Sequence, residues 1–155
     1  MVLVNGGDPQ RLAEHLTRVS APCGLGIVPQ DHPTSTGITI TLGALAQAVQ
    51  VSGVVVAVKA KAPPPAPTVA ALTKEVDVPV FGGLGGVGLL DELLAGSSGA
   101  MTGFTVPEAL VATVDAWRRG IITEAHVHTP GLAMPAALHP ALDARLSAVP
   151  LPCVE

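Results

Sequence analysis

Lys59 is the residue whose position most clearly indicates chemistry. It directly follows residues 54–58 (VVVAV), the most hydrophobic run in the sequence. Such a run is typical of a buried parallel strand, and ligands bind at the carboxyl ends of such strands. Burial there lowers the pKa of a lysine, and a neutral amine attacks carbonyl carbons to form a Schiff base. The alternative is a lysine that simply extends its ammonium group into solvent.

A polar loop is expected at the same edge of the sheet. Residues 30–37 (QDHPTSTG) follow the apolar run 25–28. Asp31 or His32 could move protons there, and the alternative is ordinary turn and cap chemistry. Lys61 would face the same way as Lys59, but its place in a loop makes it the weaker candidate.

A glycine-rich segment suggests a second kind of ligand. Residues 83–88 (GLGGVG) match the G-x-G-x-x-G pattern between a predicted strand and a predicted helix. The acid that dinucleotide binding requires at the end of the next strand is missing, because residues 101–104 read MTGF. A dinucleotide-binding α/β module therefore remains an alternative, and we expect no cofactor. A glycine-rich helix start can also receive another anionic group.

The elements that must position these residues alternate along the sequence. Short apolar runs are followed by loops and amphipathic segments, and proline-rich residues 62–67 are predicted to connect a strand to a helix. Strand starts recur at roughly 20–30 residues, the size of a βα unit, which predicts parallel strands with right-handed crossovers. A complete (β/α)₈ barrel needs roughly 250 residues, so about five units cannot close one. The alternative is a doubly wound open sheet. The runs are residues 2–4, 25–28, 54–58, 78–81 and 100–102.

Composition excludes several classes of protein. The 155 residues are 48% hydrophobic and 13% charged, which excludes a disordered chain. A net charge of −4 gives no basic surface for nucleic acid, and no apolar stretch approaches the roughly 20 residues of a membrane helix. Cys23 and Cys153 fit reduced thiols of a cytoplasmic protein. His126, His128 and His139 lack the carboxylate or Cys that would complete a metal site, so no metal is predicted.

Several ordered motifs resemble the second half of the dihydrodipicolinate synthase / N-acetylneuraminate lyase family. The motifs are the run that ends in Lys59, the segments 78–86 (VPVFGGLGG) and 99–108 (GAMTGFTVPE), and the loop 31–37 (DHPTSTG). The resemblance covers residues 1–120 and implies a partial TIM barrel, with the five runs as strands four to eight. Residues 121–155 do not resemble the family and are expected to form an irregular tail with one short helix.

The resemblance also implies an activity and a set of site residues. Members of this family are class I aldolases and lyases that form a Schiff base with pyruvate or a related 2-keto acid. Lys59 matches the lysine that forms the Schiff base. Gly82 and Gly83 match glycines that line the keto-acid pocket, and Gln30 and Thr36 are expected to contact the substrate.

The sequence also departs from the family pattern. Gln30 stands where the family usually has a proton-shuttling tyrosine, and Ser35 stands where an arginine is common. The Gly-Thr-Thr-Gly-Glu motif, which binds the substrate carboxylate, would precede Met1. We therefore expect a truncated member with impaired activity. The alternative is a catalytically silent half-barrel that works by association, with a second copy or another partner supplying the missing strands.

Overall fold

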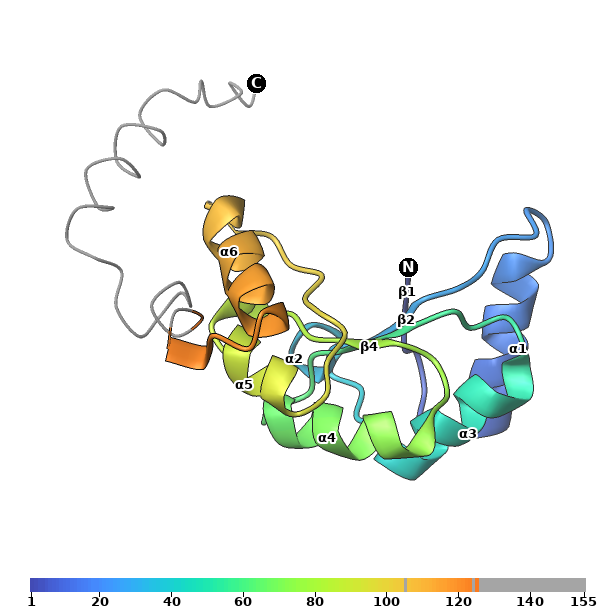
Figure 1. Ribbon diagram of the computed structural model, residues 1–155. Helices are drawn as coiled ribbons and strands as arrows, with labels where there is room; N and C mark the ends of the chain where they lie inside the picture. Colours follow the sequence, from blue (N-terminus) through green and yellow to red (C-terminus); the bar gives the residue numbers. More distant parts are fainter. Residues whose placement is uncertain (105, 124, 126–155) are drawn as a thin grey trace, which may run out of the picture.

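The computed structural model describes residues 1–104, 106–123 and 125. Most of the predicted tail, with His126, His128, His139 and Cys153, lies outside these residues. The described part is a parallel sheet with helices packed along it (Figure 1).

The strands follow one another across the sheet in the order of the sequence. All neighbouring pairs are parallel, and a single bridge from Gly82 to Ala100 places the fifth apolar run beside the last strand. This order confirms the predicted partial TIM barrel of about five βα units, with the fifth unit reduced to a bridge. The strands are β1 (Val2–Leu3), β2 (Pro29–Asp31), β3 (Val58–Ala60) and β4 (Val80–Phe81).

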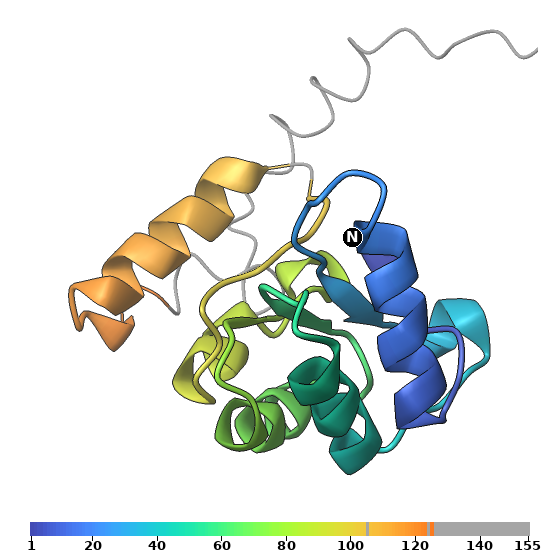
Figure 2. The ribbon, with the colours of Figure 1, turned by 90° about the vertical axis from the view of Figure 1, so that its right-hand side faces the viewer.

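The helices α1, α3, α4 and α5 pack side by side in succession around the outside of the sheet, and α6 packs on α5 (Figures 1 and 2). An arc of strands with its helices on the outer face is the arrangement expected of part of a barrel. The helices are α1 (Pro9–Ser20), α2 (Pro33–Thr36), α3 (Leu42–Ser52), α4 (Pro65–Glu75), the 3₁₀ turn η1 (Leu84–Gly86), α5 (Leu89–Leu94) and α6 (Pro107–Arg118).

Local signals explain where these helices begin. The Asp8 carboxylate accepts a hydrogen bond of 2.8 Å from the Arg11 amide, and Thr41 caps α3 in the same way. Helix α4 begins at Pro65, so the predicted connecting loop 62–67 is partly helical. Prolines are tolerated in a first turn because the amide hydrogen they lack would have no partner there.

The core lies between the sheet and its helices. Leucines 12, 16, 45 and 72 are fully or almost fully buried, as is Val58 of β3. On the sheet, side chains alternate between this core and the opposite face. On that opposite face Leu3 is 45% exposed, so the described residues leave this face partly open to solvent.

A β-bulge precedes Lys59. Ile27 pairs with Val55, but Gln30 pairs with Lys59, so one strand has two intervening residues and the other has three. A bulge of this kind shifts the alternation of side chains by one residue. The hydrophobic run 54–58 therefore enters the regular ladder only at its last residue.

None of the helices within the described ranges has the length and hydrophobicity needed to span a bilayer.

Candidate functional site

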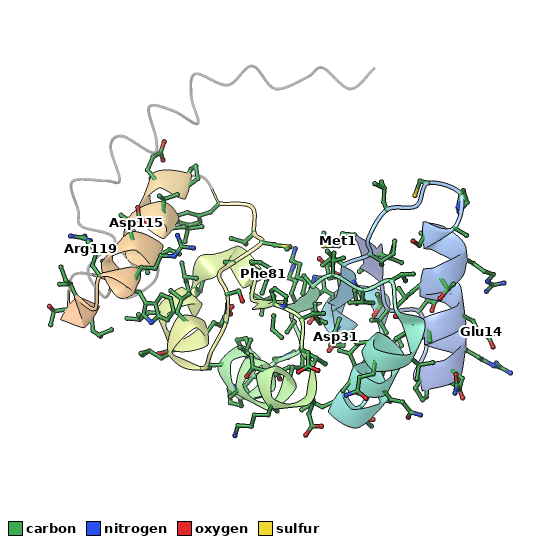
Figure 3. All side chains as sticks on the ribbon, turned by 45° about the vertical axis from the view of Figure 1, so that its right-hand side comes forward. Met1, Glu14, Asp31, Phe81, Asp115 and Arg119 are labelled. Atoms are coloured by element: carbon green, nitrogen blue, oxygen red, sulfur yellow. The ribbon has the colours of Figure 1, made fainter. Side chains whose placement is uncertain are left out.

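Lys59 lies in the middle of a row of side chains across the sheet. Leu3 pairs with Gln30, Gln30 with Lys59, and Lys59 with Phe81, so all four share one face. The next step along β2 places Asp31, which pairs with Ala60, on the opposite face of the sheet; Figure 3 labels Asp31 and Phe81 in the region of the sheet. Lys59 and Gln30, two predicted site residues, are thus brought side by side.

Burial acts directly on the Lys59 amine. The residue is 7% exposed. Burial lowers the pKa of its ammonium group, and the positive charge of Lys61 lowers it further. Both effects raise the fraction of neutral amine near pH 7, which is the form that attacks a carbonyl carbon.

Lys61 and His32 form a contact that the sequence did not indicate. The Lys61 Nζ lies 3.3 Å from the His32 Nε2. Burial lowers the pKa of His32, and the charges of Lys61 and Lys59 lower it further, so the ring is neutral at pH 7. A neutral ring accepts through Nε2 when its hydrogen is on Nδ1, so the Lys61 ammonium donates this hydrogen bond.

Thr36 acts within its own loop. Its hydroxyl donates to the His32 carbonyl at 3.2 Å and accepts from the Ile38 amide at 3.2 Å. Gly37 then ends α2 in the left-handed region, with φ of 68°. These contacts fix the backbone that carries His32, and the expected contact of Thr36 with substrate stays a prediction.

Gly82 and Gly83 adjoin two different charged side chains. A side chain at Gly82 would collide with the carboxylate of Glu92, whereas a Cβ at Gly83 would lie 3.1 Å from the Cγ of Lys61. Because consecutive residues of an extended chain face opposite sides, Gly82 faces the helices and Gly83 faces the side of Lys59. Whether either glycine lines a keto-acid pocket stays a prediction.

Glu92 of α5 was missed by the sequence analysis. It is fully buried, and within the described part of the chain neither carboxylate oxygen has a hydrogen-bond partner of normal geometry. Burial raises the pKa of Glu92 to about 6; the Gly83 amide opposes this rise and the charge of Asp91 adds to it. The available signal was its position three residues after Leu89, on the apolar side of a short helix.

Asp31 is the second buried acid near the strand ends. Its Oδ1 is buried without a partner among the residues that the structure describes, and burial raises the pKa of the carboxyl group. Its side chain faces away from Lys59, so of the two predicted proton carriers His32 is the one connected to the lysines. The described ranges contain no cluster of three His, Cys, Asp or Glu residues suited to a metal ion.

The glycine-rich segment does not lead directly into a long helix. Leu84–Gly86 forms a 3₁₀ turn, and α5, which follows, has six residues. The Gly85 amide donates to the Thr102 hydroxyl at 2.8 Å, which ties this turn to the fifth apolar run.

No family model matches the sequence, and no curated protein matches it. Solved structures of the dihydrodipicolinate synthase family share its fold. A prophage protein of this family from E. coli, YagE, solved in complex with pyruvate, is 20% identical with a TM-score of 0.69, covering 78% of this chain and 42% of that chain.

Two synthases show the same similarity of fold at low sequence identity. The 4-hydroxy-tetrahydrodipicolinate synthase of Methylacidiphilum fumariolicum is 19% identical with a TM-score of 0.71, covering 98% of this chain and 56% of that one. The dihydrodipicolinate synthase of Thermotoga maritima is 21% identical with a TM-score of 0.68, covering 97% and 50%. This chain therefore spans about half the length of each of the three proteins and has the fold of that part of the barrel.

Proposed function

We propose that this chain forms a Schiff base between Lys59 and pyruvate or a related 2-keto acid, as a class I aldolase or lyase does. The observation that carries the proposal is the buried Lys59 side chain, whose amine has a lowered pKa, next to Gln30 on the open face of a partial barrel. The fold supports the same reaction class, because a neighbour with this fold was solved in complex with pyruvate.

The proposed step follows from the state of the amine. Neutral Lys59 adds to the keto carbon, and the carbinolamine then loses its hydroxyl group as water to leave the imine. Gln30 can hydrogen-bond the hydroxyl group but cannot protonate it, because an amide is not an acid at neutral pH. Gln30 therefore cannot take the role of the proton-shuttling tyrosine of the family pattern, and we expect slow imine formation and weak turnover.

Reductive trapping tests this proposal. With pyruvate and borohydride, we expect one adduct by mass spectrometry on the peptide that contains Lys59. Lys59→Met should abolish the adduct. Lys74→Met is the matched control, because Lys74 is an exposed lysine of α4. Equal labelling of Lys59, Lys61 and Lys74 would contradict the proposal, because it would show that no lysine is specially reactive.

We also propose that the open face of the sheet associates with a second copy or with another chain that supplies strands. The supporting observation is the exposure of apolar side chains, with Leu3 45% and Val56 55% exposed. Exposed apolar area of this kind favours association at roughly 25 cal/mol per Å² buried. Sedimentation that shows a monomer at all concentrations would contradict association with a second copy and leave another chain as the partner.

A further inference from the structure

Lys59, Lys61 and His32 form a group of potential cations at the ends of β2 and β3. The charges that lower the pKa values of Lys59 and His32 come from lysines, and no acidic group of the described residues is among them. The positive charge of Lys61 disfavours the protonated forms of Lys59 and His32, because no anion of the described residues compensates it. Such a group is stabilised when an anionic ligand enters it.

Lys61 is held in place along its whole length. Its amide donates to the Asp31 carbonyl at 2.9 Å, which continues the parallel ladder beyond β3. Its aliphatic stem passes over Gly83, where a Cβ would lie 3.1 to 3.3 Å from three of its carbons. Its Nζ ends beside His32. Lys61 is therefore an ordered side chain, unlike a solvated surface lysine.

The hydrogen-bonding capacity of Lys61 is only partly used. An ammonium group has three donors, and the contact with His32 Nε2 uses one of them. Two donors remain for a ligand, and a carboxylate is the acceptor that makes the strongest hydrogen bonds with them.

The spacing of the two lysines fits one small ligand. Because the ladder continues through Lys61, Lys59 and Lys61 face the same side, roughly 6.6 Å apart along the strand. Both side chains are long enough to converge on one molecule. A 2-keto acid presents an electrophilic carbon and, bonded to it, a carboxylate.

We propose that Lys61 binds the carboxylate of the 2-keto acid whose keto carbon reacts with Lys59, and that His32 is the positioning residue that orients the Lys61 ammonium group. This inference rests on the proposed function for the identity of the ligand. The carboxylate of the ligand would then be bound by residues of this chain that lie at the ends of the neighbouring strands β2 and β3.

Lactate separates this inference from Schiff-base formation, because it has the carboxylate but no keto group. We expect lactate to shift the NMR signals of the His32 ring saturably, with the signals assigned by the variant His32→Gln. Lys61→Met keeps the stem over Gly83 and removes the charge, and it should weaken lactate binding about tenfold. Lys61→Arg should restore most of the binding, and Lys74→Met should change nothing. A linear, non-saturating shift, or one that is equal in Lys61→Met, overturns the subsite.

Trapping with pyruvate completes the test. At a given pH, Lys61→Met should raise the pyruvate concentration for half-maximal trapping about tenfold more than that for the uncharged ester methyl pyruvate, because the ester reports only the change in the pKa of Lys59. Saturable lactate binding without a pyruvate adduct would refute the proposed function and leave the subsite intact. A pyruvate adduct with the same half-maximal concentration in Lys61→Met would refute the subsite and leave the proposed function intact.

Discussion

Replacing Glu92 with glutamine tests whether a buried, unpaired carboxylate weakens the fold. Burial raises the pKa of Glu92 from an ordinary value of 4.5 to about 6. Each pKa unit corresponds to roughly 1.4 kcal/mol, so the ionised carboxylate lowers the free energy of unfolding by about 2 kcal/mol at neutral pH. Glutamine has nearly the same shape and does not ionise.

The direction of the pH effect follows from proton binding. The folded protein holds the Glu92 proton more tightly than the unfolded chain does, so unfolding releases a proton between the two pKa values. The stability due to Glu92 is fully present below pH 4.5 and is lost as the pH rises to about 6. Above about pH 7 the loss is complete.

Urea unfolding at a series of pH values from about 4 to 7.5 measures this loss. Fluorescence of Trp117, the one tryptophan of the chain, reports the transition. The free energy of unfolding of Glu92→Gln minus that of the wild type should rise by about 2 kcal/mol across this range. Asp31, whose pKa is also raised, titrates in both proteins and cancels in the difference. A difference that does not change with pH would refute the reasoning.

Three further predictions concern neighbouring features. Gly82→Ala should lower the free energy of unfolding by about 1–3 kcal/mol in urea unfolding, because the added methyl group collides with Glu92. In a protein that already carries Glu92→Ala, the same Gly82→Ala substitution should cost less, because the collision is gone. Thr41→Ala should lower the free energy of unfolding by about 1 kcal/mol through loss of the α3 cap, whereas Thr41→Ser should retain it. Lys61→Met should raise the pKa of Lys59 by removing a positive neighbour, so the pH profile for trapping with methyl pyruvate should move to higher pH. An unchanged profile would show that burial alone sets that pKa.

The order of the elements could be predicted because its signals are local. The recurrence of apolar runs indicates βα units, and the caps at Asp8 and Thr41 are recognisable within four residues of sequence. The bounds of the strands were predicted less accurately than the order of the elements. The run 25–28 lies before β2 (Pro29–Asp31), because hydrophobicity marks residues packed on the helices, whereas the ladder depends on where neighbouring backbones meet.

Lys59 could be identified as a candidate from the sequence alone, because a charged residue directly after a hydrophobic run is unusual. Its neighbours could not be found in this way. His32 and Lys61 are 29 residues apart in sequence and meet because β2 and β3 are adjacent in the sheet. Glu92 is buried because Gly82, ten residues earlier, leaves room for a carboxylate. Such long-range complementarity has no signature in the spacing of residue types.

Gly82 and Gly83 place one charged side chain on each side of the same strand end. Glu92 fills the place of a side chain at Gly82 on the helix side, and the stem of Lys61 lies over Gly83 on the open side. The backbone thus separates the acid from the base, and no lysine is among the groups that shift the pKa of Glu92. If the carboxylate reached Lys61, an internal ion pair would neutralise the ammonium group. Because the two glycines face opposite sides, Lys61 has no carboxylate partner within the described residues and can bind the carboxylate of a ligand.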